Sequence, residues 1–230
     1  MRDRGKKFIE KAKLVDRAKV YSPVDAVKLV KQSAFAKFDE TVDLTVVLGF
    51  DQKKGGETVR GTVALPAGTG KSVRIGVIAK GDKISEAEAA GADFTGSDDI
   101  IQKISGGWLD FDVLIATPDM MGSVGRLGKL LGQRGLMPNP KSGTVTFDIA
   151  KTVKEFKGGK IEFKADKTGV LHLKAGKVSF DEASLLKNFH AIFEAINKAR
   201  PASAKGTFIK SVTLSSTMGP GVKVDTKKLI

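Results

Sequence analysis

Hydrophobic and polar residues alternate through the first third of the chain, as is typical of half-buried strands. Such alternation over 41–48 predicts a strand that has one buried and one solvated face, and 59–65 follows the same pattern. Before them, Ser22 and Pro23 predict the start of a helix over 22–33, because Ser22 suits the N-cap and Pro23 the first helical position.

The pattern changes in the middle of the chain. The nearly continuous apolar run of 73–79 predicts a strand that is covered on both faces. Further strands are expected at 92–94 and 111–116, alternating with helices that begin at the Ser85 capping box, at Ser97 and at Thr117-Pro118. This alternation predicts a parallel sheet with helices on both sides.

The last third returns to the half-buried pattern. Short strands are expected at 161–164 and 170–173, joined by the turn residues Asp166, Lys167, Thr168 and Gly169. An apolar stripe at helical spacing predicts a helix over 181–199, and 207–214 predicts a final strand. The two ends of the chain therefore predict a two-layer α+β arrangement whose sheet has a free polar face.

Charge supports the same division. Residues 1–66 carry 14 Lys and Arg against 9 Asp and Glu, and 159–230 carry 13 against 6, whereas 67–158 carry 12 against 11. We therefore predict an α/β protein of two domains. A basic domain is formed by 1–66 together with 159–230, and a near-neutral domain, 67–158, is inserted into it.

Composition narrows the class of partner. The chain has 230 residues, no cysteine, a net charge of +13 and a pI near 9.8. Its start lacks the apolar run of a secretory signal, and no apolar stretch approaches the ~20 residues that span a bilayer. We expect a cytoplasmic protein that binds nucleic acid and no membrane. The alternative for any single lysine cluster is an inert basic surface.

The motifs that carry catalysis are incomplete. The segment 67–72, AGTGKS, resembles the end of a phosphate-binding loop, but Leu65 replaces the required first glycine and a strand is expected to follow. A glycine-rich hinge is the better interpretation. Gly122, Gly125 and Gly128 recur at every third position of a helical pattern, which we attribute to close helix packing. We identify no catalytic group, cofactor site or metal site, so no enzymatic activity is expected.

Two segments are candidates for direct contact with RNA. Phe38 either anchors the core or stacks on a base beside the phosphate-seeking Lys37. The loop 215–221, SSTMGPG, combines hydroxyl groups, which can bond ribose 2′-OH and phosphate groups, with glycines that allow a close approach of two backbones. We expect Thr217→Val to weaken RNA binding with little change in the melting temperature.

Several runs along the chain resemble the bacterial ribosomal protein L1 family, whose member forms the mobile stalk of the large subunit. These runs are AKF at 36–38, VRG at 59–61, LPAGTGKSVR at 65–74, GQRGLMPNPK at 132–141 and STMG at 216–219. The resemblance covers essentially the whole chain. It implies that the inserted domain is Rossmann-like with three layers, and that the basic domain binds a stem-loop of large-subunit rRNA.

The resemblance also implies functional residues and further partners. The family's RNA-contact positions correspond to Lys37, Phe38, Asp166, Lys167, Thr168, Gly169, His172, Ser211, Thr217, Met218 and Gly219. Implied partners are deacylated tRNA leaving the exit site and an mRNA of the protein's own operon, whose translation the protein would repress. We expect a monomer off the ribosome. The competing hypotheses are a nucleotide-binding enzyme that uses 67–72 and a nonspecific DNA-binding protein.

Overall fold

The computed structural model describes residues 5–49, 58–201, 204 and 206–226, and it divides into two compact units. Unit 1 joins Met1–Gly70 with Ile161–Ile230, and unit 2 comprises Lys71–Lys160. The mixed α/β class predicted from the sequence is confirmed. The chain leaves unit 1 at Gly70 and returns at Ile161, whereas the sequence placed these crossings after residues 66 and 158.

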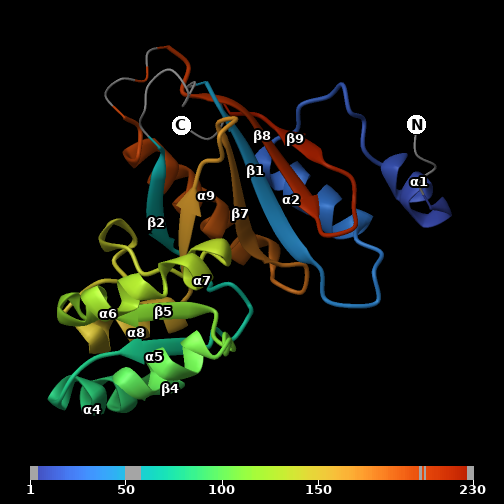
Figure 1. Ribbon diagram of the computed structural model, residues 1–230. Helices are drawn as coiled ribbons and strands as arrows, with labels where there is room; N and C mark the ends of the chain where they lie inside the picture. Colours follow the sequence, from blue (N-terminus) through green and yellow to red (C-terminus); the bar gives the residue numbers. More distant parts are fainter. Residues whose placement is uncertain (1–4, 50–57, 202–203, 205, 227–230) are drawn as a thin grey trace. The chain divides into compact units, whose positions relative to one another are not determined.

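Unit 1 contains a four-stranded antiparallel sheet in which strands from both ends of the chain lie side by side (Figure 1). The strand order is β7 (Val170–Lys177), β1 (Thr41–Leu48), β8 (Ile209–Ser216) and β9 (Val222–Val224). The central strand β1 pairs with β7 on one side and with β8 on the other. Both of its partners come from the C-terminal third, so neither end of the chain can build this sheet alone.

Two helices cover one face of this sheet. They are α2 (Pro23–Ser33) and α9 (Glu182–Lys198). The predicted cap of α2 is confirmed, since the Ser22 side chain accepts a hydrogen bond from the backbone N–H of Asp25 at 3.2 Å. The even-numbered residues of β1 and the apolar stripe of α9 meet in one core that includes Leu44, Val46, Phe189, Ile192 and Ile196. The opposite face of the sheet keeps the polar side chains.

Smaller elements complete unit 1. Helix α1 (Lys6–Ala12) has no buried residue, and β2 (Arg60–Ala64) pairs with β6 (Lys160–Lys164) in a separate two-stranded sheet. The segment after β2 is fastened to α9 by Asn188, which is fully buried. Asn188 accepts a hydrogen bond from the backbone N–H of Ala67 at 3.0 Å and donates to the carbonyl of Gly68 at 3.0 Å.

The structure of the segment 67–72 does not fit a phosphate-binding loop. Gly68 and Gly70 have φ angles of 72° and 71°, and β3 (Ile75–Ile78) is the first element that follows them. A phosphate-binding loop needs a helix at this point, because helix backbone N–H groups hold the phosphate. The interpretation as a glycine-rich connection is the one that agrees with the structure.

Unit 2 is built around a parallel three-stranded sheet. The strand order is β4 (Phe94–Gly96), β3 and β5 (Val113–Ala116). Helices α4 (Asp82–Ala89) and α8 (Ile149–Lys157) share a core with Val77 and Ile115. The neighbouring strand residues Ile78 and Leu114 point to a second core with α5 (Asp98–Ser105), α6 (Met121–Arg126) and α7 (Gly128–Gln133). Short 3-10 turns, η1 (Pro118–Met120) and η2 (Pro140–Ser142), complete the unit.

Two local predictions in unit 2 are wrong. Helix α4 begins at Asp82, three residues before the predicted capping box, because Gly81 adopts a φ of 57° and starts the helix there. The glycines of α6 and α7 do not serve close packing. A Cβ atom built on Gly122, Gly125 or Gly132 would meet nothing within 4 Å, and one on Gly128 would touch only the Met137 side chain at 3.9 Å.

Candidate nucleic-acid interface

The polar face of the four-stranded sheet forms rows that run across the strands. One row joins His172 on β7, Thr45 on β1, Thr213 on β8 and Lys223 on β9. The Thr45 hydroxyl lies 3.4 Å from Nδ1 of His172. Neighbouring rows pair Lys174 with Asp43 and Ser215, and Val170 with Val47 and Ser211. The predicted candidates His172 and Ser211 therefore do lie on this face, and both are exposed.

One end of the face carries the turn that joins β6 to β7. A single carboxylate oxygen of Asp166 accepts hydrogen bonds from Thr168 N at 2.9 Å, Thr168 Oγ1 at 2.7 Å and Val170 N at 2.8 Å. The hydrogen bonds from Val170 and Thr168 lower the pKa of Asp166. Gly169 adopts a φ of 79° and contributes its carbonyl to Leu48 N at 2.8 Å. The turn thus exposes Lys167 on a fixed backbone.

The other end of the face is organised by Glu40, which is only 2 % exposed. One of its carboxylate oxygens accepts hydrogen bonds from Phe35 N at 2.8 Å and Ala36 N at 2.7 Å, and the other accepts from Met218 N at 3.0 Å. Burial alone would raise the pKa of Glu40, but these backbone hydrogen bonds, together with the Ser216 side chain, outweigh it and hold that pKa below its usual value. One carboxylate therefore fastens the loop before β1 to the loop after β8.

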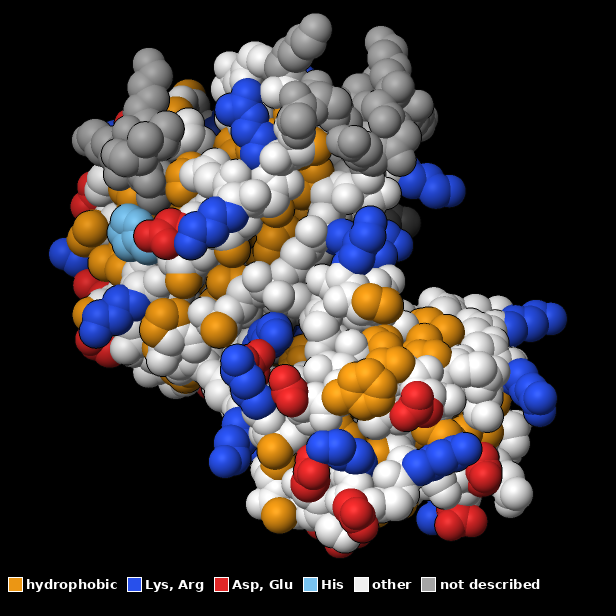
Figure 2. All heavy atoms as spheres, turned by 90° about the vertical axis from the view of Figure 1, so that its left-hand side faces the viewer, with side chains coloured by type: hydrophobic (Ala, Val, Ile, Leu, Met, Phe, Trp, Pro, Cys, Tyr) orange, Lys and Arg blue, Asp and Glu red, His pale blue; other side chains and the backbone are white. Residues whose placement is uncertain are grey.

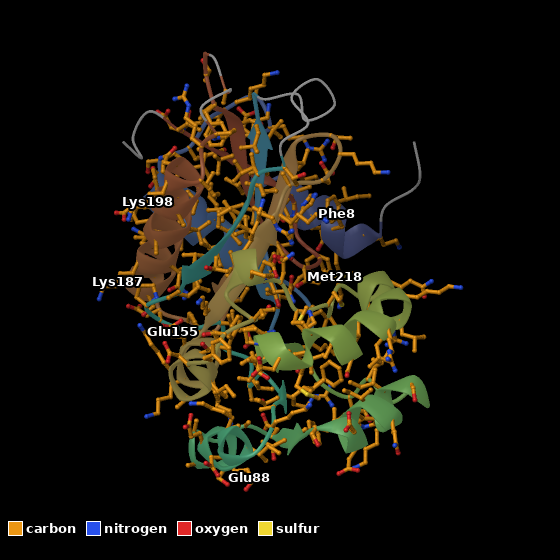
Figure 3. The ribbon with its side chains drawn as sticks, turned by 60° about the vertical axis from the view of Figure 1, so that its left-hand side comes forward. Phe8, Glu88, Glu155, Lys187, Lys198 and Met218 are labelled. Atoms are coloured by element: carbon orange, nitrogen blue, oxygen red, sulfur yellow. The ribbon has the colours of Figure 1, made fainter. Side chains whose placement is uncertain are left out.

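These two loops present the most exposed large apolar side chains of the sheet end. Phe38 is 56 % exposed and Met218 is 50 % exposed, and Figure 3 labels Met218 on the loop that follows β8. The interpretation of Phe38 as a core anchor is therefore wrong. Lys37 beside it is exposed too. Asp39 holds the loop from the other side, because its carboxylate accepts from Ser179 N at 3.2 Å and Ser179 Oγ at 2.9 Å.

Thr217 and Gly219 shape the second loop. The Thr217 hydroxyl accepts from Thr41 N at 3.0 Å and donates to Thr41 O at 3.3 Å, so it continues the pairing of β1 with β8. The expectation that Thr217→Val leaves the melting temperature unchanged is therefore revised, since the variant loses both hydrogen bonds. A Cβ on Gly219 would lie 2.5 Å from the Ser216 hydroxyl oxygen, so a larger residue here requires at least the Ser216 side chain to move.

The candidates thus form two clusters rather than one. Lys37, Phe38, Thr217, Met218 and Gly219 lie at one end of β1, and Asp166–Gly169 at the other, roughly 25 Å away for a strand of eight residues. His172 lies between the clusters on the sheet face, and Ser211 lies near the second cluster. An extended polar ligand can contact both ends at once.

Several residues of this face were not among the sequence candidates. Lys174, Lys223 and Lys177 supply positive charge, and Lys177 Nζ donates to Thr41 Oγ1 at 3.1 Å. Burial raises the pKa of Asp43, although Lys174, His172 and Lys177 oppose this shift. The alternation in β1 already placed Asp43 and Thr45 outward, but the partners on β7 and β9 require the strand register.

This surface has the chemistry of a polyanion site rather than of a catalytic or metal centre. Among the described residues, no group of three or more His, Asp or Glu is placed to hold a metal ion. Within the same residues, no helix has the length and apolar character that crossing a bilayer requires. What the surface offers is cations, hydroxyls and two exposed apolar side chains on loops that hydrogen bonds hold in place.

Comparison with known families agrees with this chemistry. Residues 30–220 match the model of the family described as "Ribosomal protein L1p/L10e family". Members of this family are structural, RNA-binding proteins of the large ribosomal subunit and are not known as enzymes. The resemblance drawn from the sequence is confirmed, and so is the ribosomal location. The chain belongs to the ribosomal protein L1p/L10e family and is a large-subunit ribosomal protein that binds rRNA.

Proposed function

We propose that unit 1 binds a stem-loop of large-subunit rRNA through the polar face of its sheet and the two loops joined by Glu40. The observation that carries this proposal is the pair of exposed apolar side chains, Phe38 and Met218, on loops fastened by one buried carboxylate. A large apolar side chain exposed beside cations is costly in water, and an unstacked RNA base is a partner that covers it.

The proposed division of labour follows from the chemistry of each group. Lys37, Lys167, Lys174 and Lys223 neutralise phosphates, which supplies attraction but little sequence selectivity. Phe38 stacks on a base, and the hydroxyls of Thr45 and Thr213 together with His172 bond ribose 2′-OH groups. Gly219 keeps the loop surface low enough for a backbone to approach.

The architecture that accompanies this proposal is a discontinuous one. We propose that residues 1–66 and 159–230 form the RNA-binding domain and that 67–158 form an inserted Rossmann-like domain. The support for this division is the two compact units, the charge of the two ends and the parallel order β4-β3-β5. Neither unit is expected to catalyse a reaction.

The direct test is binding of the full chain to an rRNA stem-loop at several salt concentrations. Phe38→Ala removes one stacking contact worth ~1–3 kcal/mol, so affinity should fall about 5- to 150-fold while the melting temperature stays the same. The control is Lys187→Gln with Lys198→Gln, because Figure 3 shows both lysines on α9 and directed away from the sheet. Equal losses in both variants would contradict the proposed surface.

Two further roles follow from family membership as proposals. We propose that the protein assists release of deacylated tRNA from the exit site, and that it binds an mRNA of its own operon as a monomer and represses translation. If the mRNA imitates the rRNA stem-loop, the two RNAs must compete for one surface. Phe38→Ala should then lower both affinities by the same factor, and a selective loss of either one would separate the two sites.

A further inference from the structure

The near-neutral charge of unit 2 conceals a strongly basic stretch. From Met120 to Phe147 the sequence contains no Asp or Glu, but it contains Arg126, Lys129, Arg134 and Lys141. All of the acidic residues of unit 2 fall outside this stretch. Over the face of unit 2 that Figure 2 shows, acidic and basic side chains are interspersed. The stretch from Met120 to Phe147 differs from that mixed surface, and a stretch with cations and no acidic residue is typical of a surface that binds a polyanion.

Three of these cations lie on one pair of short helices. Val124, Leu127 and Leu131 bury the inner side of α6 and α7 in the core of unit 2. At 100° per residue, Arg126 and Lys129 fall on the opposite, outer side, and Arg134 follows at the C-terminal end of α7. All three side chains are exposed.

These cations have no partner among the residues that the structure describes. Among the described residues, Arg126, Lys129 and Arg134 form no side-chain hydrogen bond or ion pair, whereas Lys71, Lys83, Lys157 and Lys160 of the same unit each pair with a carboxylate. Repulsion among unpaired like charges destabilises the helices that carry them. An anionic ligand bound at this surface would neutralise these charges and remove the repulsion.

Three exposed positions of the same helices carry no side chain. Gly122, Gly125 and Gly132 are exposed, and a Cβ added to any of them would meet nothing within 4 Å. Packing therefore does not require glycine, although glycine is the poorest helix former after proline, by up to about 1 kcal/mol relative to alanine. The missing side chains at these three positions leave room for a bulky sugar–phosphate backbone to approach the cations.

We propose that the outer face of α6 and α7 binds the sugar–phosphate backbone of a folded RNA, separately from the sheet surface of unit 1. Arg126, Lys129 and Arg134 contact phosphates, and the exposed glycines of the same two helices leave room for the ribose–phosphate chain. The contact reads backbone and shape rather than bases, because cations outnumber the single exposed amide of Gln133 and neither helix carries an aromatic side chain. It rests on the RNA-binding role proposed above but uses a different unit of the chain.

The test compares two triple variants of the full chain that remove the same charge from unit 2. The first replaces Arg126, Lys129 and Arg134 by Gln. The control replaces Lys80, Lys151 and Lys154, which are also exposed, by Gln. Affinities for deacylated tRNA and for an rRNA stem-loop are measured against salt concentration. We expect the first variant, relative to the control, to make the slope of log affinity against log salt shallower by about 2 for one of these RNAs.

A third variant tests the role of the glycines without altering charge. Gly122→Gln, Gly125→Gln and Gly132→Gln add bulk to the outer face, where each side chain enters open space, so the melting temperature should not fall. The affinity for the same RNA should drop at least ~5-fold. A decrease of 1 kcal/mol in binding free energy corresponds to about that factor.

The pattern of losses identifies the source of the RNA. A loss with tRNA alone supports the proposal with tRNA as the ligand, and a loss with the stem-loop alone supports it with rRNA. Unchanged affinities and slopes for both RNAs in the charge variant, relative to the control, would overturn it. The effect of Phe38→Ala is measured independently, so failure of the unit 1 interface and failure of this second surface are distinguishable.

Discussion

Loss of the buried carboxylate of Glu40 should lower the stability of unit 1 markedly. Glu40→Gln is the smallest substitution that removes this carboxylate. The glutamine keeps the shape of the side chain and one acceptor oxygen, which can still receive Phe35 N and Ala36 N. Its amide nitrogen replaces the oxygen that accepts from Met218 N at 3.0 Å, so two donors then face each other.

The magnitude follows from the three hydrogen bonds. Two of them lose their charge assistance, and bonds to charged groups contribute about 1.5–3 kcal/mol against about 0.5–1.5 for neutral ones. The third is lost and leaves the partly buried N–H of Met218 without an acceptor, at ~1–3 kcal/mol. The easier burial of a neutral amide offsets part of this loss. We expect the free energy of unfolding to fall by about 2–3 kcal/mol at pH 7.

The assay is urea unfolding of the full chain at pH 7 and at lower pH, together with binding to the rRNA stem-loop. Because the folded-state pKa of Glu40 is lowered, its contribution is complete above the unfolded value of about 4.3 and disappears as pH falls through the folded value. The gap between wild type and variant should therefore narrow in acid. The control is Glu162→Gln, which disrupts only a partly exposed pair with Arg60 and should cost less than ~1 kcal/mol. Equal costs in the two variants would refute the reasoning.

Three further predictions concern single side chains. Asn188→Ala leaves Ala67 N without its acceptor and the Gly68 and Ala175 carbonyls without their donor, so urea unfolding should show a loss of about 2–4 kcal/mol. Gly125→Ala enters open space and should raise the stability of unit 2 by up to about 1 kcal/mol, measured by thermal unfolding. Burial raises the pKa of Asp43, so the negative charge of Asp43 opposes folding above that pKa. Asp43→Asn should be at least as stable as wild type at pH 7 and should lose that advantage below about pH 4, where both side chains are neutral. Because the variant removes a negative charge, it should also bind generic RNA more tightly in a filter-binding assay.

The strands and helices that the sequence predicts best are those whose pattern is long and uninterrupted. The alternation in β1 gave its bounds, 41–48, and the cap residues gave the start of α2. Strand β9 has three residues, too few for a pattern, and depends on its pairing with β8. Helix α8 was not predicted, although Ile149, Val153 and Phe156 recur at helical spacing along it.

The site was less predictable because it is made by tertiary contacts. Phe38 shares the parity of the buried residues in β1, but the loop between them breaks the alternation, and only the structure shows that Phe38 is exposed. Glu40 and Met218 are 178 positions apart, so no local pattern joins them. Helical spacing grouped the glycines of α6 and α7 but did not reveal which side of the helices they face.

The strand order of unit 1 also determines when the protein can begin to act during its own synthesis. Strand β1 emerges early, yet its neighbours β7 and β8 are translated more than a hundred residues later. Unit 2 is contiguous and can fold on the nascent chain, whereas the sheet of unit 1 must wait for the last strands. An unfinished polypeptide therefore lacks the interface. If the protein represses translation of its own mRNA, only fully synthesised molecules can bind that mRNA.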